Sequence, residues 1–166
     1  MSHPRLSVAL DAPDALPPEG RIALFRPTSE TELSDLPRAR VHAVQGFRPD
    51  FEALAGRGFA VSPGAEPPYA AAVVFLPRAK AEARALLAEA NAAVVPGGPI
   101  WVDGLKTDGV DSVLRDLRGL IAVDPPYAKA HGKIFRFTAT PGALAAWAAQ
   151  PGHPAPGFTT LPGVFS

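Results

Sequence analysis

The sequence has no cysteine, no long hydrophobic run and no excess of either charge. Without cysteine the chain forms no disulfide and offers no thiolate to a metal. No apolar run approaches the roughly 20 residues that cross a bilayer, and the first residues carry no export signal. Sixteen Lys and Arg balance sixteen Asp and Glu, so no overall field draws the chain to nucleic acid or a membrane. We expect a cytoplasmic protein with no membrane or metal partner.

Familiar catalytic patterns are also missing. Metal-ligand spacing is absent among the four histidines, His3, His42, His131 and His153. Ser62 and Ser112 have no paired histidine and no nucleophile-elbow glycines around them. We therefore expect neither a zinc site nor a hydrolase.

The stretch from residue 69 to 107 indicates the architecture. An apolar run over 70–76 ends at Pro77, an alanine- and leucine-rich segment covers 79–95, and a second apolar run covers 100–102. The middle segment places one apolar residue at every third or fourth position: Ala83, Leu86, Leu87, Ala90 and Val94. This pattern predicts a strand, a helix and a strand of a parallel sheet.

The flanking sequence extends the same alternation. Further strands are predicted at 21–27, 41–45 and 58–62, with helices at 28–33, from 48 onward and from 107 to 120. A short strand at 121–123 is expected to pair antiparallel with 133–139, before a last helix over 141–150. We predict an α/β, doubly wound, Rossmann-like fold with a mostly parallel sheet and a C-terminal antiparallel strand pair.

Several short strings resemble one family. Residues 160–166, Thr-Leu-Pro-Gly-Val-Phe-Ser, resemble the segment that joins the two halves of the ribosomal RNA small subunit methyltransferase C family. Residues 75–83 and 103–112 match in the same order, and Pro96-Gly97-Gly98 is similar to the turn that many methyltransferases place before a strand. The family contains bacterial guanine-N2 methyltransferases with a duplicated methyltransferase fold. The resemblance implies a degenerate methyltransferase-like N-terminal domain over 1–150, and a Pro/Gly-rich linker over 151–166 that leads to a catalytic domain absent from this chain.

The resemblance also implies what this half lacks. The intact enzyme would transfer a methyl group from S-adenosylmethionine to a guanine of 16S rRNA. The turn Phe25-Arg26-Pro27-Thr28-Ser29 has no glycine where that cofactor requires close backbone approach. Leu76-Pro77-Arg78-Ala79 stands where the catalytic half carries an Asn-Pro-Pro-Phe motif, and Asp124-Pro125-Pro126-Tyr127 is similar to that motif but follows a different strand. We expect no catalytic and no cofactor-binding residue here, the cofactor being bound by the missing half.

Basic residues suggest contact with ribosomal RNA. Four of them fall at or just past predicted strand ends, which share one edge of a parallel sheet: Arg26, Arg78, Lys80 and Lys106. Lys129 and Lys133 lie beside the last loop. Such side chains contact phosphates without reading sequence, although charged residues also line an ordinary solvated surface.

Two other functions fit the same residues. The chain could be a stand-alone protein- or RNA-binding module with a methyltransferase-like fold and no enzyme activity. It could also be an independent methyltransferase with a divergent site at Asp124. In the leading hypothesis its partners are its own catalytic domain and small-subunit rRNA.

Overall fold

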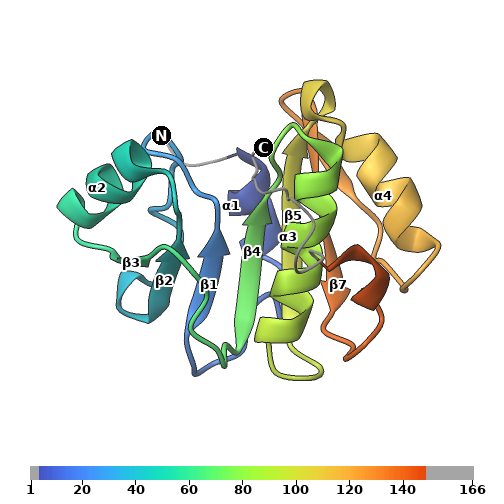
Figure 1. Ribbon diagram of the computed structural model, residues 1–166, viewed down its shortest axis with the longest axis horizontal. Helices are drawn as coiled ribbons and strands as arrows, with labels where there is room; N and C mark the ends of the chain where they lie inside the picture. The colour runs from blue at the N-terminus through green and yellow to red at the C-terminus, as the bar shows by residue number, and fades with distance from the viewer. Residues whose placement is uncertain (1–3, 149–166) are drawn as a thin grey trace.

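The protein is built on a seven-stranded sheet with the strand order β3-β2-β1-β4-β5-β7-β6 (Figure 1). The computed structural model describes residues 4–148. Five strands are parallel: β1 (Ile22–Phe25), β2 (Val41–Val44), β3 (Ala60–Ser62), β4 (Ala71–Phe75) and β5 (Pro99–Leu105). The last two run antiparallel as a hairpin: β6 (Tyr127–Lys129) and β7 (Gly132–Thr138). The predicted fold class is confirmed.

Helices cover both faces of the sheet. α3 (Lys80–Ala93) and α4 (Val110–Arg118) pack on the face formed by Ala23 and Phe25 of β1. α1 (Pro4–Leu10) and α2 (Arg48–Gly56) pack on the opposite face, against Ile22 and Leu24. Successive strand residues point to opposite faces, so this division follows directly from the buried run in β1. Within residues 4–148, none of the helices has the length and apolar character needed to span a bilayer.

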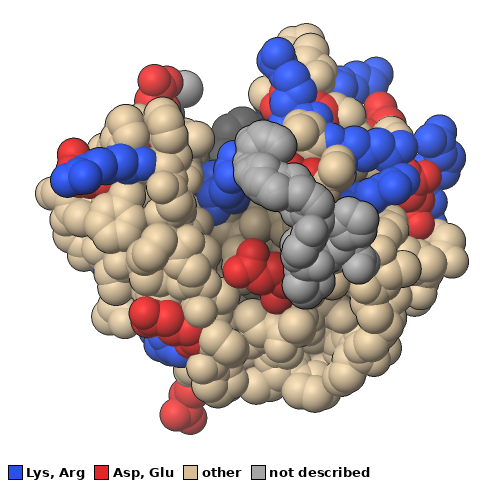
Figure 2. Space-filling view, in the orientation of Figure 1, with Lys and Arg blue, Asp and Glu red and all other residues tan. Residues whose placement is uncertain are grey.

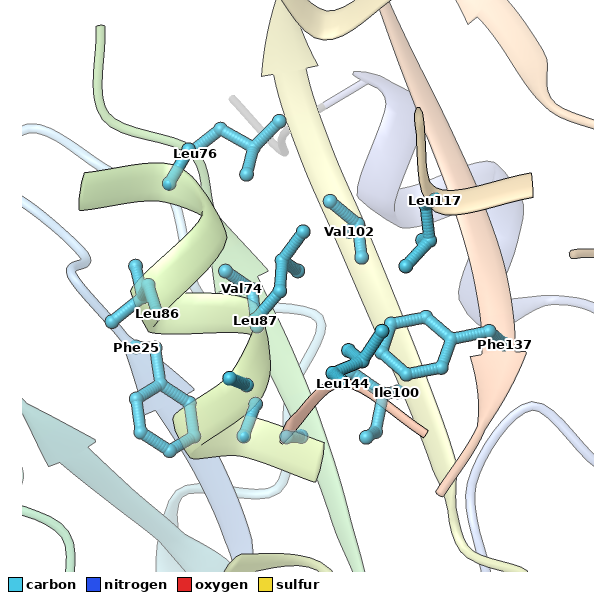
Figure 3. Packing of buried hydrophobic residues seen from close by; sticks show 14 of the residues in the cluster. Phe25, Val74, Leu76, Leu86, Leu87, Ile100, Val102, Leu117, Phe137 and Leu144 are labelled. Carbon is cyan, nitrogen blue, oxygen red and sulfur yellow. The ribbon is translucent and has the colours of Figure 1, made fainter. Parts of the chain in front are cut away.

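The unit β4-α3-β5 forms the centre of the core. Leu86 and Leu87 of α3 lie over Val74 of β4 and Val102 of β5, as Figure 3 shows. The helix ends where the chain turns back into β5, and a Cβ on Gly98 would lie 2.5 Å from the Ala70 carbonyl oxygen. The glycine is therefore needed for close approach of the turn to β4, and the predicted strand-helix-strand unit is confirmed.

A buried ion pair joins α1 to β5, on the sheet face opposite α3 and α4. The Arg5 guanidinium donates to both carboxylate oxygens of Asp103, with Nε–Oδ1 at 2.6 Å and Nη2–Oδ2 at 3.1 Å. The Nη1 atom donates to the carbonyls of Lys129 and Ala130, at 2.9 and 3.1 Å. Both charged side chains are only 6% exposed. This pairing, between residues far apart in the sequence, joins α1 to β5 and to the β6–β7 hairpin.

Three predicted elements differ in the structure. Residues 28–33 form turns rather than a helix, because the Thr28 and Thr31 hydroxyls bond nearby backbone N–H groups. The predicted strand at 121–123 contributes only an isolated bridge from Val123 to Phe137, and β6 forms after the two prolines instead. The predicted helix at 141–150 is reduced to one 3₁₀ turn, Ala145–Trp147. Residues 149–150 and the predicted linker 151–166 lie outside the described residues.

Candidate functional site

The carboxyl edge of the parallel strands is where this architecture binds ligands. From β1 the chain adds β2 and β3 on one side of β1, and it then crosses back to place β4 on the other side. The change of direction therefore falls between β1 and β4, at the upper edge of the sheet in Figure 1. Arg26-Pro27 and Leu76-Pro77 follow these two strands.

The turn after β1 has the backbone shape of a glycine turn without the glycine. Arg26 has φ of 66°, in the left-handed region that glycine adopts most easily. Pro27 has no N–H group. Three backbone N–H groups of the turn donate to the protein itself: Arg26 to the Val44 carbonyl (3.0 Å), Thr28 to the Thr31 hydroxyl (2.8 Å) and Ser29 to the Asp50 carboxylate (2.9 Å). These donors are thus occupied internally, at the turn where a ligand would need them.

The side chain of Gln45, just after β2, forms hydrogen bonds within the protein. It follows β2, about 20 residues past the first turn, where dinucleotide-binding folds place an acid that holds a ribose hydroxyl. Its side-chain Nε2 donates to the Pro27 carbonyl at 2.9 Å, and its Oε1 accepts from the Phe47 N–H at 2.9 Å. The side chain is buried and ties the turn after β1 to the loop after β2.

The position after β4 is filled by an apolar side chain. Leu76 is 8% exposed and packs in the core among the side chains of Figure 3. A Cβ on Gly104 would lie 2.9 Å from its Cδ1, so the leucine occupies the space above β5. No amide faces the edge from this position.

The Asp124-Pro125-Pro126-Tyr127 string lies elsewhere. Asp124 accepts from Arg136 Nε at 2.8 Å, and its own N–H donates to the Arg136 carbonyl at 2.9 Å. Arg136 pairs in register with Trp101, in the amino-terminal half of β5 and so away from the carboxyl edge. The Asp124 carboxylate is therefore held by an arginine of β7, away from the carboxyl edge, whereas Tyr127 pairs with Ile134, which lies opposite Asp103.

A groove of about 500 Å³ opens beside Arg26 on the α3 face. It exists because residues 63–70 connect β3 to β4 without a crossover helix, which leaves this part of the sheet uncovered. The Arg26 guanidinium bonds the Glu82 carboxylate at 2.7 Å beside the groove. Its lining is mainly apolar and includes Val44, Pro63, Ala85, Ala88, Ala92 and Ala148. Figure 2 looks onto this face and shows it hollowed beside α3.

A buried histidine fastens the loop that replaces the missing helix. His42 Nε2 lies 3.1 Å from Ser62 Oγ, and His42 Nδ1 lies 2.6 Å from the Tyr69 hydroxyl. The Glu66 N–H donates to that tyrosine oxygen at 2.7 Å, and Ser62 Oγ donates to the Gly64 carbonyl at 2.6 Å. The network assigns the proton to Nε2 of a neutral imidazole, in agreement with burial, which lowers the pKa of His42.

This network corrects one expectation from the sequence. Ser62 does have a histidine partner, from the neighbouring strand β2 rather than from a nearby position in the chain. Its hydroxyl proton, however, points to the Gly64 carbonyl and away from the imidazole. A nucleophilic serine must give its proton to the histidine, so the pair acts as a structural link.

Five of the six predicted RNA-contacting residues lie on one connected surface, and Arg26 lies apart beside the groove. Arg26 is paired with Glu82, Arg78 with Asp108 at 3.3 Å and Lys80 with Asp116 at 3.0 Å. Three others line a pocket of about 390 Å³ together with His131: Lys106, Lys129 and Lys133. Lys106 and Asp108 belong to the same 3₁₀ turn, η2 (Lys106–Asp108), so this turn connects the two groups.

The structure adds cations that the strand-end argument missed. Arg84, Arg115 and Lys80 all reach Asp116, at 2.7, 3.6 and 3.0 Å. Hydrogen bonds from Arg84 and then Lys80 lower the pKa of Asp116 to about 2. The charged face of α4, with Arg115 and Arg118 in its last turn, was the sequence signal for this part. We call the whole region the cationic surface: Arg78, Lys80, Arg84, Lys106, Arg115, Arg118, Lys129 and Lys133.

Among the described residues, the cationic surface carries eight basic side chains against three contacting carboxylates, those of Asp108, Asp111 and Asp116. Although the whole sequence has no net charge, its charges are unevenly distributed, and this surface has an excess of positive charge. Figure 2 shows the basic side chains gathered over α4 and the amino-terminal end of α3. Across residues 4–148 there is no cluster of three or more His, Asp or Glu side chains that could hold a metal ion.

Solved structures share the fold of this chain, although neither a protein-family model nor a curated protein matches its sequence. The T. thermophilus 16S rRNA N2 methyltransferase RsmC, solved with AdoMet and guanosine, has a TM-score of 0.66 at 20% identity. A putative methyltransferase from Pseudomonas syringae has a TM-score of 0.63 at 14% identity, with 81% of this chain and 96% of that chain covered. The fold is that of the methyltransferases.

Coverage differs among these methyltransferase structures. The match to RsmC covers 85% of this chain but only 40% of the RsmC chain. TrmN from Thermus thermophilus, with a TM-score of 0.53 at 15% identity, covers 73% of this chain and 44% of its own. This chain therefore spans less than half the length of two of its methyltransferase neighbours.

The turn after β1 differs from a glycine-rich cofactor turn in its residues and in its hydrogen bonds. RsmC was solved with AdoMet, and NodS from Bradyrhizobium japonicum with S-adenosyl-L-homocysteine. Here Arg26 and Pro27 replace the small residues that close approach requires. The Gln45 bridge and the internally bonded N–H groups occupy the polar atoms at this edge.

Proposed function

We propose that this chain is the N-terminal, non-catalytic domain of an S-adenosylmethionine-dependent 16S rRNA guanine-N2 methyltransferase. Residues 1–150 would form the domain, and 151–166 would link it to a catalytic half that binds the cofactor. The observation that carries the proposal is the turn after β1, whose N–H groups bond the protein itself. The string at 160–166 and the 40% coverage of RsmC support the assignment to one half of such an enzyme.

Cofactor binding tests the non-catalytic part of the proposal. Isothermal titration of the 166-residue chain with S-adenosylmethionine should give no binding heat, because Pro27 has no N–H group and the Arg26, Thr28 and Ser29 N–H groups donate to the protein itself. Incubation with labelled cofactor and 16S rRNA should transfer no methyl group. Tight binding of the cofactor would overturn the proposal.

The groove beside α3 is the surface that this proposal assigns to the catalytic half. It is mainly apolar, and Ala148, the last described residue, lines it. In the two-domain protein, Ala92→Arg in the groove should lower the melting temperature of the assembly. Ala81→Arg provides a matched control, because Ala81 is exposed on the same helix but does not line the groove. Equal effects of the two variants would argue against this contact.

The coding sequence after Ser166 distinguishes the leading function from a stand-alone binding module in the cytoplasm. A glycine-rich turn after a strand and an Asn-Pro-Pro-Phe string downstream would support the methyltransferase. A stop codon there would favour the module, which the cationic surface supports equally well. The six residues predicted to contact RNA remain proposals in both cases: Arg26, Arg78, Lys80, Lys106, Lys129 and Lys133.

A further inference from the structure

The hairpin between β6 and β7 has a two-residue turn with unusual residue types. Its two loop residues, Ala130 and His131, both have left-handed backbones, with φ of 53° and 62°. Turns of this shape favour Asn-Gly or Gly-Gly, since side chains other than those of glycine and asparagine resist positive φ. The glycine lies one residue later, at 132, where a Cβ would come within 2.5 Å of the Gly104 carbonyl oxygen. The loop thus keeps two side chains at positions where glycine would be less strained.

Buried Arg5 holds this turn in place. Its Nη1 bonds the carbonyls of Lys129 and Ala130, while Asp103 holds the rest of the guanidinium. A Cβ on Gly132 would lie 2.7 Å from Arg5 Cζ, so the hairpin rests directly on the guanidinium. On the other side, the Lys106 N–H bonds the His131 carbonyl at 2.9 Å. These bonds compensate the strain and fix the direction in which the turn presents its side chains.

The side chains that the turn presents complete a basic pocket. Lys106 from η2, Lys129 and His131 from the hairpin, and Lys133 from β7 line a space of about 390 Å³. The Asp111 carboxylate lies in the same pocket and binds Lys133 Nζ at 2.6 Å, which lowers the pKa of Asp111. Three lysines therefore face one carboxylate, and Lys106 and Lys129 have no ion-pair partner among the described residues.

We propose that the pocket of Lys106, Lys129, His131 and Lys133 holds one phosphate group of the RNA, with Arg5 and Asp103 as positioning residues. The pocket offers donors from several directions and an excess of positive charge, the chemistry that phosphate requires. The proposal rests on the RNA role above and gives it a definite contact.

Inorganic phosphate is the first probe. In amide NMR spectra of the full chain, titration should shift the signals of residues 106 and 129–133 in a saturable way. Asp111→Asn should tighten phosphate binding, because it removes the one carboxylate that competes for Lys133. Shifts spread evenly over the protein, or an unchanged affinity in the Asp111→Asn variant, would overturn the pocket as a phosphate site.

Single-stranded RNA is the second probe. The double variant Lys106→Ala, Lys129→Ala should weaken binding at all sequences and reduce the slope of log affinity against log salt by about 1. Arg48→Ala is the matched control, since Arg48 is 86% exposed on α2, distant from the hairpin in Figure 1. An equal loss in the control would refute a specific contact.

The two probes separate this inference from the proposed function. Phosphate binding without any RNA binding would leave the pocket intact but remove the RNA role of the domain. RNA binding that ignores the double variant would keep the RNA role and refute the pocket. A milder change, Arg5→Lys, keeps the charge but loses the two-pronged contact with Asp103, so it should reduce phosphate binding while Lys106 and Lys129 remain.

Discussion

Removing the carboxylate of Asp103 should be among the most damaging single changes in this protein. Asp103→Ala leaves the Arg5 guanidinium, which is 6% exposed, without its charged partner. Loss of one member of a buried pair costs about 3–5 kcal/mol, because the remaining charge is desolvated without compensation. Domains of this size have a total stability of about 5–15 kcal/mol, so the variant should lose a large fraction of it.

Urea unfolding followed by far-UV circular dichroism measures this loss. The chain contains its own control, the Arg136–Asp124 pair, at 2.8 Å between Nε and Oδ2, whose side chains are 29% and 55% exposed. Solvent screens that pair, so Asp124→Ala should cost below about 1 kcal/mol. Replacing both partners of the buried pair, Arg5→Met with Asp103→Leu, should recover much of the stability. Equal losses for Asp103→Ala and Asp124→Ala would refute the reasoning.

Three further predictions concern the core, a turn and pH. Leu87→Ala should destabilise the fold by about 2–5 kcal/mol in the same unfolding assay, since Leu87 is fully buried and its loss leaves a cavity. Gly98→Ala should lower the melting temperature, because the added Cβ would lie 2.6 Å from Val94 Cγ1. Gly97→Ala is the comparison: its Cβ would meet no neighbour, but its φ is 89°, so any loss there measures backbone strain alone. Burial lowers the pKa of His42 below 6.5, so the unfolded chain takes up a proton that the folded chain resists. Stability should therefore fall as pH decreases below about 6.5, and His42→Gln should remove that part of the pH dependence; an unchanged profile would contradict it.

Local sequence patterns predicted the parts of the fold that depend on neighbours in the chain. The alanine- and leucine-rich segment predicted α3 because its apolar spacing continues for several turns, and the helix ends at Ala93, before the turn Pro96-Gly97-Gly98. Residues 28–33 look like a capped helix start, but the Thr28 and Thr31 hydroxyls stabilise turns instead. The same residue types serve both structures, so the sequence alone favours neither.

The candidate site was predictable only in part, because much of it depends on contacts between distant segments. Strand-end positions placed Lys106 correctly at the carboxyl edge, yet its connection to Lys129 needs the hairpin to fold back beside η2. The Ser62–His42 contact follows from the pairing of two strands, 20 residues apart in sequence. Gln45 carries no motif, and its role emerges only from the two backbone groups that it bridges.

The contact between Arg5 and the β6–β7 hairpin bears on how the domain is made. The two sides of that contact lie 124 residues apart, so the arginine leaves the ribosome long before the carbonyls that it will hold. During synthesis the first helix cannot reach its final place until the last strand has emerged. Fusion tags or truncations at the start of the protein should therefore alter the conformation of the β6–β7 turn, which Arg5 holds through the Lys129 and Ala130 carbonyls.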